Sequence, residues 1–130
     1  MIQLKSYLNV IDNTGALVAE CIRTLNNTKV ARVGDEIVVA VKKARSVSDS
    51  SLSSTAASKI RKGDVRRALI VRTKSPIARP DGSNIRFDDN ACILLNNQKQ
   101  PLGTRILGLV AADIKAKGWN KVVSLAPKVV

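Results

Sequence analysis

Residues 68–95 (ALIVRTKSPIARPDGSNIRFDDNACILL) constrain the fold of this chain more than any other stretch. The apolar runs at 68–71 and 91–95 predict strands, because both are short, uninterrupted and bounded by polar or turn-forming residues. Between them, the sequence PDG at 80–82 predicts a tight turn, since proline presets φ at about −65° and glycine accepts a positive φ. The stretch therefore predicts a basic β-hairpin between two apolar strands.

Short strand signals recur along the rest of the chain. The turn cluster DNTG at 12–15 follows an apolar segment that ends at Ile11, and Asn26 with Asn27 predicts a second turn. Residues 17–24 carry apolar side chains on both faces, which indicates a strand buried on both sides. Five or six short strands separated by turns predict a mainly β fold and a small β-barrel. Strands are expected at 17–24, 36–44, 65–73, 85–87 and 91–95, and the β pattern extends through 103–110.

The end of the chain changes from β to helical character. Residues 111–117 (AADIKAK) have the alanine and lysine content of a short helix, which Gly118 would end. An apolar stretch at 122–125 then leads to Ala126 and Pro127.

Length and composition favour one compact unit. A chain of 130 residues that is 45% hydrophobic can close a single core, so residues 1–130 are expected to form one domain. The segment 46–59 (SVSDSSLSSTAASK) departs from this, because seven of its residues are serine. It has too little apolar surface to offset the entropy of ordering it, so a mobile surface loop is expected, with phosphoregulation as an alternative use.

The charge balance predicts the kind of partner. The chain carries 22 Lys and Arg against 10 Asp and Glu, a formal net charge of +12 spread along its length. Such an excess predicts a polyanion, and nucleic acid fits better than a membrane surface. No apolar run approaches the roughly 20 residues that span a bilayer, and the N-terminal MIQLKSYLNV lacks a signal-peptide pattern. We therefore expect a soluble protein with no membrane partner.

Composition argues against catalytic and metal chemistry. The chain has no histidine, which excludes histidine-based acid–base catalysis and Ser-His or Cys-His dyads. No glycine-rich phosphate-binding motif occurs, and the adjacent carboxylates at 35–36 and 88–89 would point to opposite faces of a strand. Cys21 and Cys92 lie in apolar runs and are too few for structural zinc, so both are expected to be buried and free. No enzyme activity, cofactor or metal is expected.

RNA binding without base stacking is the mode that the composition favours. Tyr7, Phe87 and Trp119 are the only aromatic residues, too few for the stacking recognition of single-stranded bases. Basic residues around the central hairpin are expected to dock on folded RNA through its phosphates; the alternative is that they are ordinary solvated charges. The candidate residues are Lys42, Lys43, Arg61, Lys62, Arg66, Arg67, Arg72, Lys74, Arg79 and Arg86.

Six motifs, in order along nearly the whole chain, resemble one known family, the universal large-subunit ribosomal protein numbered fourteen. The motifs are LNVIDNTGA near the N-terminus, GDxIxxxVKKA at 34–44, KGDVxRAxIVRTK at 62–74, RPDGSxIRFDxNACxLLN at 79–96, QPxGTRIxG at 100–108 and the ending VVSLAP. The resemblance implies a five-stranded β-barrel with a protruding β-ribbon and short C-terminal helices.

The resemblance also implies function and partners. A member of this family binds large-subunit rRNA, which would make the ten basic residues an rRNA-binding set. It contacts ribosomal proteins nineteen and three and lies at the subunit interface, where it helps form bridges to small-subunit rRNA. The matching residues Thr104, Arg105 and Lys121 would form the face that the ribosome silencing factor recognises.

The chain departs from the bacterial members of the family in one segment. They have a short basic loop where this chain has the serine-rich segment 46–59, while the ending SLAP is of bacterial type. A bacterial-type protein with such an insertion indicates a mitochondrial ribosome, with the bacterial cytoplasm or a plastid as alternatives. The alternative function is a free-standing RNA-binding factor of translation or ribosome maturation.

Overall fold

The computed structural model describes residues 2–25, 29–45 and 60–130. The serine-rich segment 46–59 and the turn predicted at Asn26 and Asn27 lie outside the described residues. In chain order the elements are β1 (Tyr7–Val10), β2 (Ala16–Thr24), β3 (Glu36–Ala44), β4 (Val65–Arg72), β5 (Ile77–Ala78), β6 (Asn84–Ile85), β7 (Ala91–Leu95), β8 (Leu109–Val110), α1 (Asp113–Ala116), α2 (Asn120–Leu125) and β9 (Lys128–Val129).

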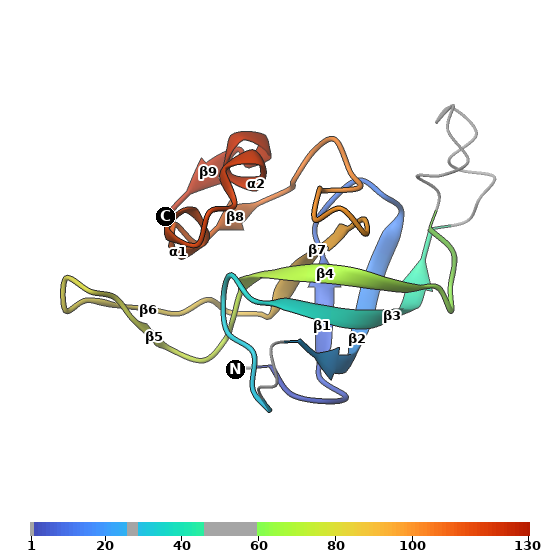
Figure 1. The fold of residues 1–130 in the computed structure, drawn as a ribbon, viewed down its shortest axis with the longest axis horizontal. Helices are drawn as coiled ribbons and strands as arrows, with labels where there is room; N and C mark the ends of the chain where they lie inside the picture. Colours follow the sequence, from blue (N-terminus) through green and yellow to red (C-terminus); the bar gives the residue numbers. More distant parts are fainter. Residues whose placement is uncertain (1, 26–28, 46–59) are drawn as a thin grey trace.

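A closed barrel forms the centre of the molecule (Figure 1). Its strands follow the order β1, β2, β3, β4, β7. Sequential neighbours are antiparallel, whereas β1 and β7 pair in parallel and close the barrel, with Val10 opposite Cys92. The predicted mainly β fold with a small five-stranded barrel is confirmed.

The apolar runs that predict the strands also supply the core. Residues 68–71 of β4 and all of β7 are buried, and Leu69 lies opposite Ile93 in the pairing of these strands. From β3, Ile37, Val39 and Val41 point inward at alternate positions, as a period of two requires. Because consecutive side chains of a strand point to opposite faces, the runs on β4 and β7 fill the barrel with one face and pack under the C-terminal segment with the other, and Ile114 and Val122 belong to the same core.

β2 contradicts the prediction that residues 17–24 are buried on both faces. Ala19 and Cys21 are buried, but Leu17 is 40% exposed and Ile22 is 37% exposed. Register shifts interrupt the β2–β3 pairing, one of them between Cys21 and Arg23. Each shift changes which face the following side chains occupy, and the outer face of this strand lies on the barrel surface.

A narrow β-ribbon protrudes from the barrel between β4 and β7 (Figure 1). It consists of β5 and β6, which pair with each other, so the strand predicted at 85–87 begins one residue earlier and ends at Ile85. The predicted turn at 80–82 forms its tip, where Gly82 has a φ of +91°. Asp81 there accepts hydrogen bonds from the backbone N–H and the hydroxyl of Ser83, at 2.9 and 2.6 Å.

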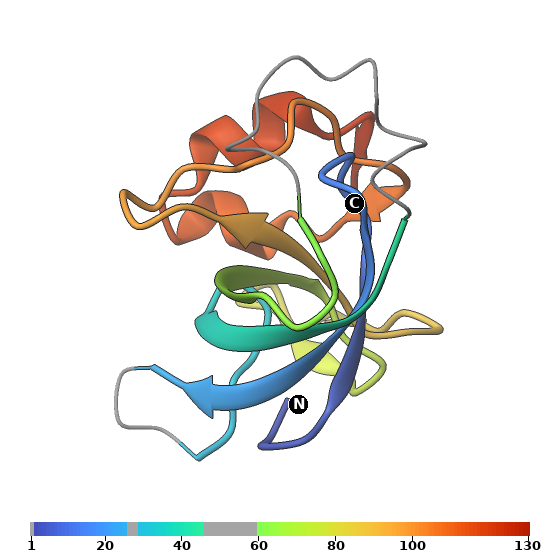
Figure 2. The ribbon, with the colours of Figure 1, turned by 90° about the vertical axis from the view of Figure 1, so that its right-hand side faces the viewer.

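The C-terminal segment covers one side of the barrel with β8, α1, α2 and β9 (Figures 1 and 2). Within the predicted helix 111–117, α1 occupies Asp113–Ala116, and Gly118 beyond it has a φ of +93°. The β pattern expected over 103–110 is reduced to β8 and a single bridge between Asp12 and Ile106. Within the described residues, no helix has the length and apolar character needed to cross a membrane.

Candidate nucleic-acid interface

The predicted RNA-binding residues fall into two groups, at opposite ends of β4. At its start, Gly63 donates to the Val41 carbonyl at 2.8 Å, which holds the end of β3 beside the turn at 61–64. At its other end lies the ribbon. An eight-residue strand spans on the order of 25 Å, so the structure does not bring all ten residues into one cluster. The turn group is Lys42, Lys43, Arg61, Lys62 and Arg66, the ribbon group is Arg72, Lys74, Arg79 and Arg86, and Arg67 lies on β4 between them.

Ion pairs distinguish the members of these groups. Among the described residues, no carboxylate forms an ion pair with Lys43, Arg61, Lys62, Arg67, Lys74 or Arg86, so these six can neutralise phosphate without losing a partner. Four others are paired: Lys42 with Glu20 at 3.6 Å, Arg66 with Asp64 at 3.8 Å, Arg72 with Asp89 at 3.4 Å and Arg79 with Asp113 at 3.4 Å.

The side chain of Arg72 is mostly buried against the barrel. Its side chain is only 16% exposed, and its Nη2 lies 3.4 Å from Oδ2 of Asp89. The same carboxylate oxygen accepts a hydrogen bond from the amide of Asn9 at 3.1 Å. Arg72 therefore links the end of β4 to the segment before β7, and phosphate binding would compete with this link.

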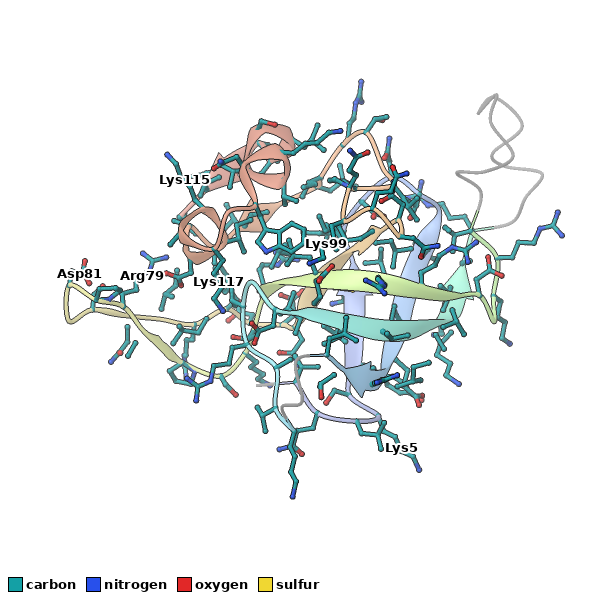
Figure 3. All side chains as sticks on the ribbon, in the orientation of Figure 1. Lys5, Arg79, Asp81, Lys99, Lys115 and Lys117 are labelled. Atoms are coloured by element: carbon teal, nitrogen blue, oxygen red, sulfur yellow. The ribbon has the colours of Figure 1, made fainter. Side chains whose placement is uncertain are left out.

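Arg79 joins the ribbon to the C-terminal segment (Figure 3). Its guanidinium contacts the carboxylate of Asp113 at the start of α1 and donates to the carbonyl of Val130. Both partners are far away in sequence, so charge counting could not identify them. This arginine orients the ribbon, whereas Lys74 and Arg86 on the same arm are exposed.

Asn13 organises the loop that carries Thr104 and Arg105. Its Oδ1 accepts from the backbone N–H groups of Thr104 at 2.8 Å and Arg105 at 3.2 Å, and its Nδ2 donates to the Thr104 hydroxyl at 2.8 Å. A Cβ on Gly103 would stand 2.6 Å from this Oδ1, so only glycine allows the approach. Both predicted residues are exposed and held at the barrel rim, next to Leu107, which is 55% exposed.

Lys121 lies apart from that loop in sequence, on α2. Its side chain is exposed, and its backbone carbonyl accepts from the Ser124 hydroxyl at 2.7 Å. Figures 1 and 2 both place α2 and the 103–106 loop on the same side of the barrel. The three predicted interface residues therefore lie on the same side of the barrel. Among the described residues, no hydrogen bond or ion pair joins the three to one another.

The C-terminal segment is clamped to the turn that precedes β3. Lys117 donates to the Val33 carbonyl at 3.0 Å and pairs with Asp35 at 3.1 Å, and the indole N–H of Trp119 donates to the Gly34 carbonyl at 3.2 Å. Trp119 therefore serves the fold. Phe87 also packs against the core, which leaves Tyr7, 61% exposed, as the aromatic side chain most open to solvent.

Comparison with known proteins supplies the family. The model described as ribosomal protein L14p/L23e matches residues 1–130. The chain belongs to this family. It is therefore a structural protein of the ribosome and not an enzyme, as the sequence predicts.

Two relatives refine the placement of this L14-family protein. It is 56% identical over 130 residues to the large ribosomal subunit protein uL14m of Schizosaccharomyces pombe, and the match covers 100% of both chains. It is 47% identical over 128 residues to uL14m of Neurospora crassa, with 98% of each chain covered. Both relatives are mitochondrial large-subunit proteins, which confirms the prediction of a mitochondrial ribosomal protein over a bacterial or plastid one.

The buried titratable groups of this L14-family protein serve its core. Cys21 and Cys92 are buried and free, as predicted, and burial raises the pKa of both thiols, which disfavours the reactive thiolate. Burial also raises the pKa of Asp12, whose carboxylate accepts from the Leu94 N–H at 2.9 Å and the Thr14 hydroxyl at 2.6 Å. In the part of the chain that the structure describes, no group of three or more Cys, Asp or Glu residues could hold a metal ion.

The sequence alone does not indicate the structural roles of two residues that position this surface. The sequence pattern places Asn13 only in a turn, although its side chain positions the loop of Thr104 and Arg105. The pattern places Asp113 only in a helix, although its carboxylate forms an ion pair with Arg79. Their partners are more than 30 residues away in each case, and one sequence carries no signal for such pairings.

Proposed function

We propose that this ribosomal protein binds large-subunit rRNA by neutralising phosphates at both ends of β4 and contributes to the subunit interface through the side that carries Thr104, Arg105 and Lys121. Its partners would then be large-subunit rRNA, small-subunit rRNA across the interface, ribosomal proteins nineteen and three, and the ribosome silencing factor. Full-length similarity to large-subunit proteins supports this over a free-standing factor.

The observation that carries the RNA proposal is the set of cations without carboxylate partners. Five of the six, Lys43, Arg61, Lys62, Lys74 and Arg86, are also exposed. Lys42 and Arg66 have side chains 48% and 40% exposed, so phosphate can reach both. Replacing the carboxylate costs little for Arg66, whose partner Asp64 is 31% exposed, and more for Lys42, whose partner Glu20 is 16% exposed. Separation of the groups by the length of β4 suits contacts with two backbone segments of folded RNA.

The interface proposal rests on the rim loop. Thr104 and Arg105 are exposed, and Asn13 holds the Thr104 hydroxyl and both backbone N–H groups, so the hydroxyl and the loop backbone are presented with little ordering left to occur on binding. Arginine suits phosphate and carboxylate partners equally, which fits both an RNA bridge and a protein factor.

Salt dependence of binding to isolated large-subunit rRNA tests the RNA proposal. The wild-type affinity should fall steeply as salt rises, and Lys74→Gln with Arg86→Gln should make the slope of log affinity against log salt shallower by about 1.4 to 1.8 for two lost phosphate contacts. The matched control is Lys5→Gln with Arg23→Gln, which removes two exposed cations outside both groups. Affinity that does not respond to salt, or an equal loss in both double variants, would overturn the proposal.

A further inference from the structure

A hollow of about 350 Å³ lies beside the base of the ribbon. It opens between the turn before β3 and the segment that leads from β4 into β5. Its volume lies near the lower end of the roughly 300–1,000 Å³ typical of small-ligand sites, which suits one nucleotide unit and not a helix. The lining residues are Arg32, Thr73, Ser75, Pro76, Ile77 and Ala78.

Both walls of this hollow are fixed by hydrogen bonds. On one side the Arg32 N–H donates to Asp35 at 2.8 Å, and Gly34 N–H donates to the Ile70 carbonyl at 2.8 Å, which ties the turn to β4. On the other side the Thr73 hydroxyl donates to the Ser75 carbonyl at 3.0 Å, and the Lys74 N–H donates to Asn90 at 2.8 Å. The hollow therefore exists before any ligand enters, which lowers the entropic cost of filling it.

The lining combines apolar side chains with one cation. Pro76, Ile77 and Ala78 offer carbon surface, and Ser75 offers a hydroxyl. Arg32 is exposed, and no ion pair of the described residues involves its guanidinium. A guanidinium plane stacks on bases and binds phosphate, so it can replace an aromatic side chain in holding a nucleotide.

Arg32 gives the hollow a positive charge, which favours an anionic ligand. The nearest carboxylate to Arg32 along the chain, Asp35, is already engaged by Lys117 at 3.1 Å and by the Arg32 backbone. A nucleotide, which carries a phosphate, complements the positive charge of Arg32.

We propose that this hollow holds one unpaired nucleotide of the bound RNA, with its base against Pro76, Ile77 and the Arg32 guanidinium. The inference rests on the proposed rRNA binding and adds a base contact to what is otherwise phosphate contact. A base that leaves its stack needs a platform, and this hollow supplies one in a chain whose Trp119 and Phe87 are used by the fold.

Variants that fill the hollow or alter its cation test the inference. Ser75→Leu and Ala78→Leu each add apolar volume at the lining, and the control Asn97→Leu adds an exposed leucine in a distant loop. Each filling variant should weaken binding to large-subunit rRNA by about tenfold, the scale of one lost base contact, with an unchanged salt slope. Arg32→Lys keeps the charge but loses the plane, so it should weaken binding by several-fold with the slope also unchanged. Since Arg32 is exposed, this variant tests the inference even if a leucine variant fails to fold.

Chemical probing of unpaired bases supplies a second readout. Wild-type protein should protect one or a few unpaired nucleotides that become reactive with the filling variants, while the protection of the phosphate backbone elsewhere persists. Wild-type affinity and base protection in all three variants would overturn the inference and leave phosphate binding intact. Normal RNA binding with failed incorporation into the subunit would also overturn it and indicate a protein side chain as the occupant. The separate proposal of phosphate binding is tested by the Lys74 and Arg86 double variant, through its salt slope.

Discussion

Arg79 in the ribbon lies 3.4 Å from Asp113 at the start of α1, measured between Nε and Oδ1. The two side chains are 23% and 22% exposed, and the same guanidinium donates to the Val130 carbonyl. One residue of the ribbon thus contacts two points of the C-terminal segment. Because β5 and β6 pair only with each other, this contact is a main constraint on the direction of the ribbon.

Replacing Arg79 with methionine should therefore destabilise the protein and loosen the ribbon. The variant keeps most of the apolar stem but leaves the half-buried Asp113 without its cation, for an expected loss of about 1–3 kcal/mol in unfolding free energy. Denaturant unfolding and hydrogen exchange of the ribbon amides measure both effects. The exposed Arg86→Met on the same arm is the control and should change stability by less than about 0.5 kcal/mol. Equal stability of the two variants would show that the Arg79 contact contributes nothing.

Thr104→Ala with Arg105→Ala should leave incorporation into the large subunit intact and weaken docking of the silencing factor or of the small subunit. The side chains removed are exposed, while Asn13 still accepts the two backbone N–H groups that shape the loop. Purified large subunits carrying the double variant, assayed for both associations, provide the measurement. Thr104→Ser serves as the control, because it keeps the hydroxyl that accepts from Asn13. Wild-type affinity for both partners would remove this loop from the interface.

Asp12 should give the protein a pH-dependent stability below neutrality. Burial raises the pKa of Asp12 in the folded chain, so the folded state holds this proton more tightly than the unfolded state does. Its contribution to stability is greatest below the usual carboxyl pKa and falls as the pH rises through the raised value. Asp12→Asn removes the titrating group and leaves one acceptor oxygen, whereas the Leu94 N–H and Thr14 donate to two different oxygens of Asp12. The stability advantage of wild type over Asp12→Asn should shrink from acidic to neutral pH in denaturant titrations, and a constant difference would refute this account.

The barrel was predictable because its strands correspond to short apolar runs in the sequence. The run at 68–71 and the run of β7 are buried over their whole length, and Ile37, Val39 and Val41 keep a period of two. β2 was not predictable at the same level, since its bulges depend on pairing with β3 and change the faces of Leu17 and Ile22. A single sequence therefore predicts where the strands are, but not the register shifts between paired strands.

The candidate site was predictable in composition but not in arrangement. Arg72, Arg79 and Lys74 are all cations of one basic stretch, yet two of them are tied to Asp89 and Asp113 and the third has no carboxylate partner among the described residues. Which cation is available to RNA depends on carboxylates that folding brings near. The hollow beside Arg32 has the same origin, because its walls come from segments about 40 residues apart in the chain.

The parallel pairing of β1 with β7 determines when a newly made chain can complete its fold. β1 is the first strand and β7 the last strand of the barrel, so Val10 cannot meet Cys92 until almost the whole barrel sequence has been synthesised. Until then β1 and β4 each expose an unpaired edge to other chains, and closure over such a separation is intrinsically slow. The net charge of +12 opposes association of these unfinished chains by mutual repulsion. The cations proposed to bind RNA in the assembled subunit would thus already oppose aggregation of the protein before it meets any RNA.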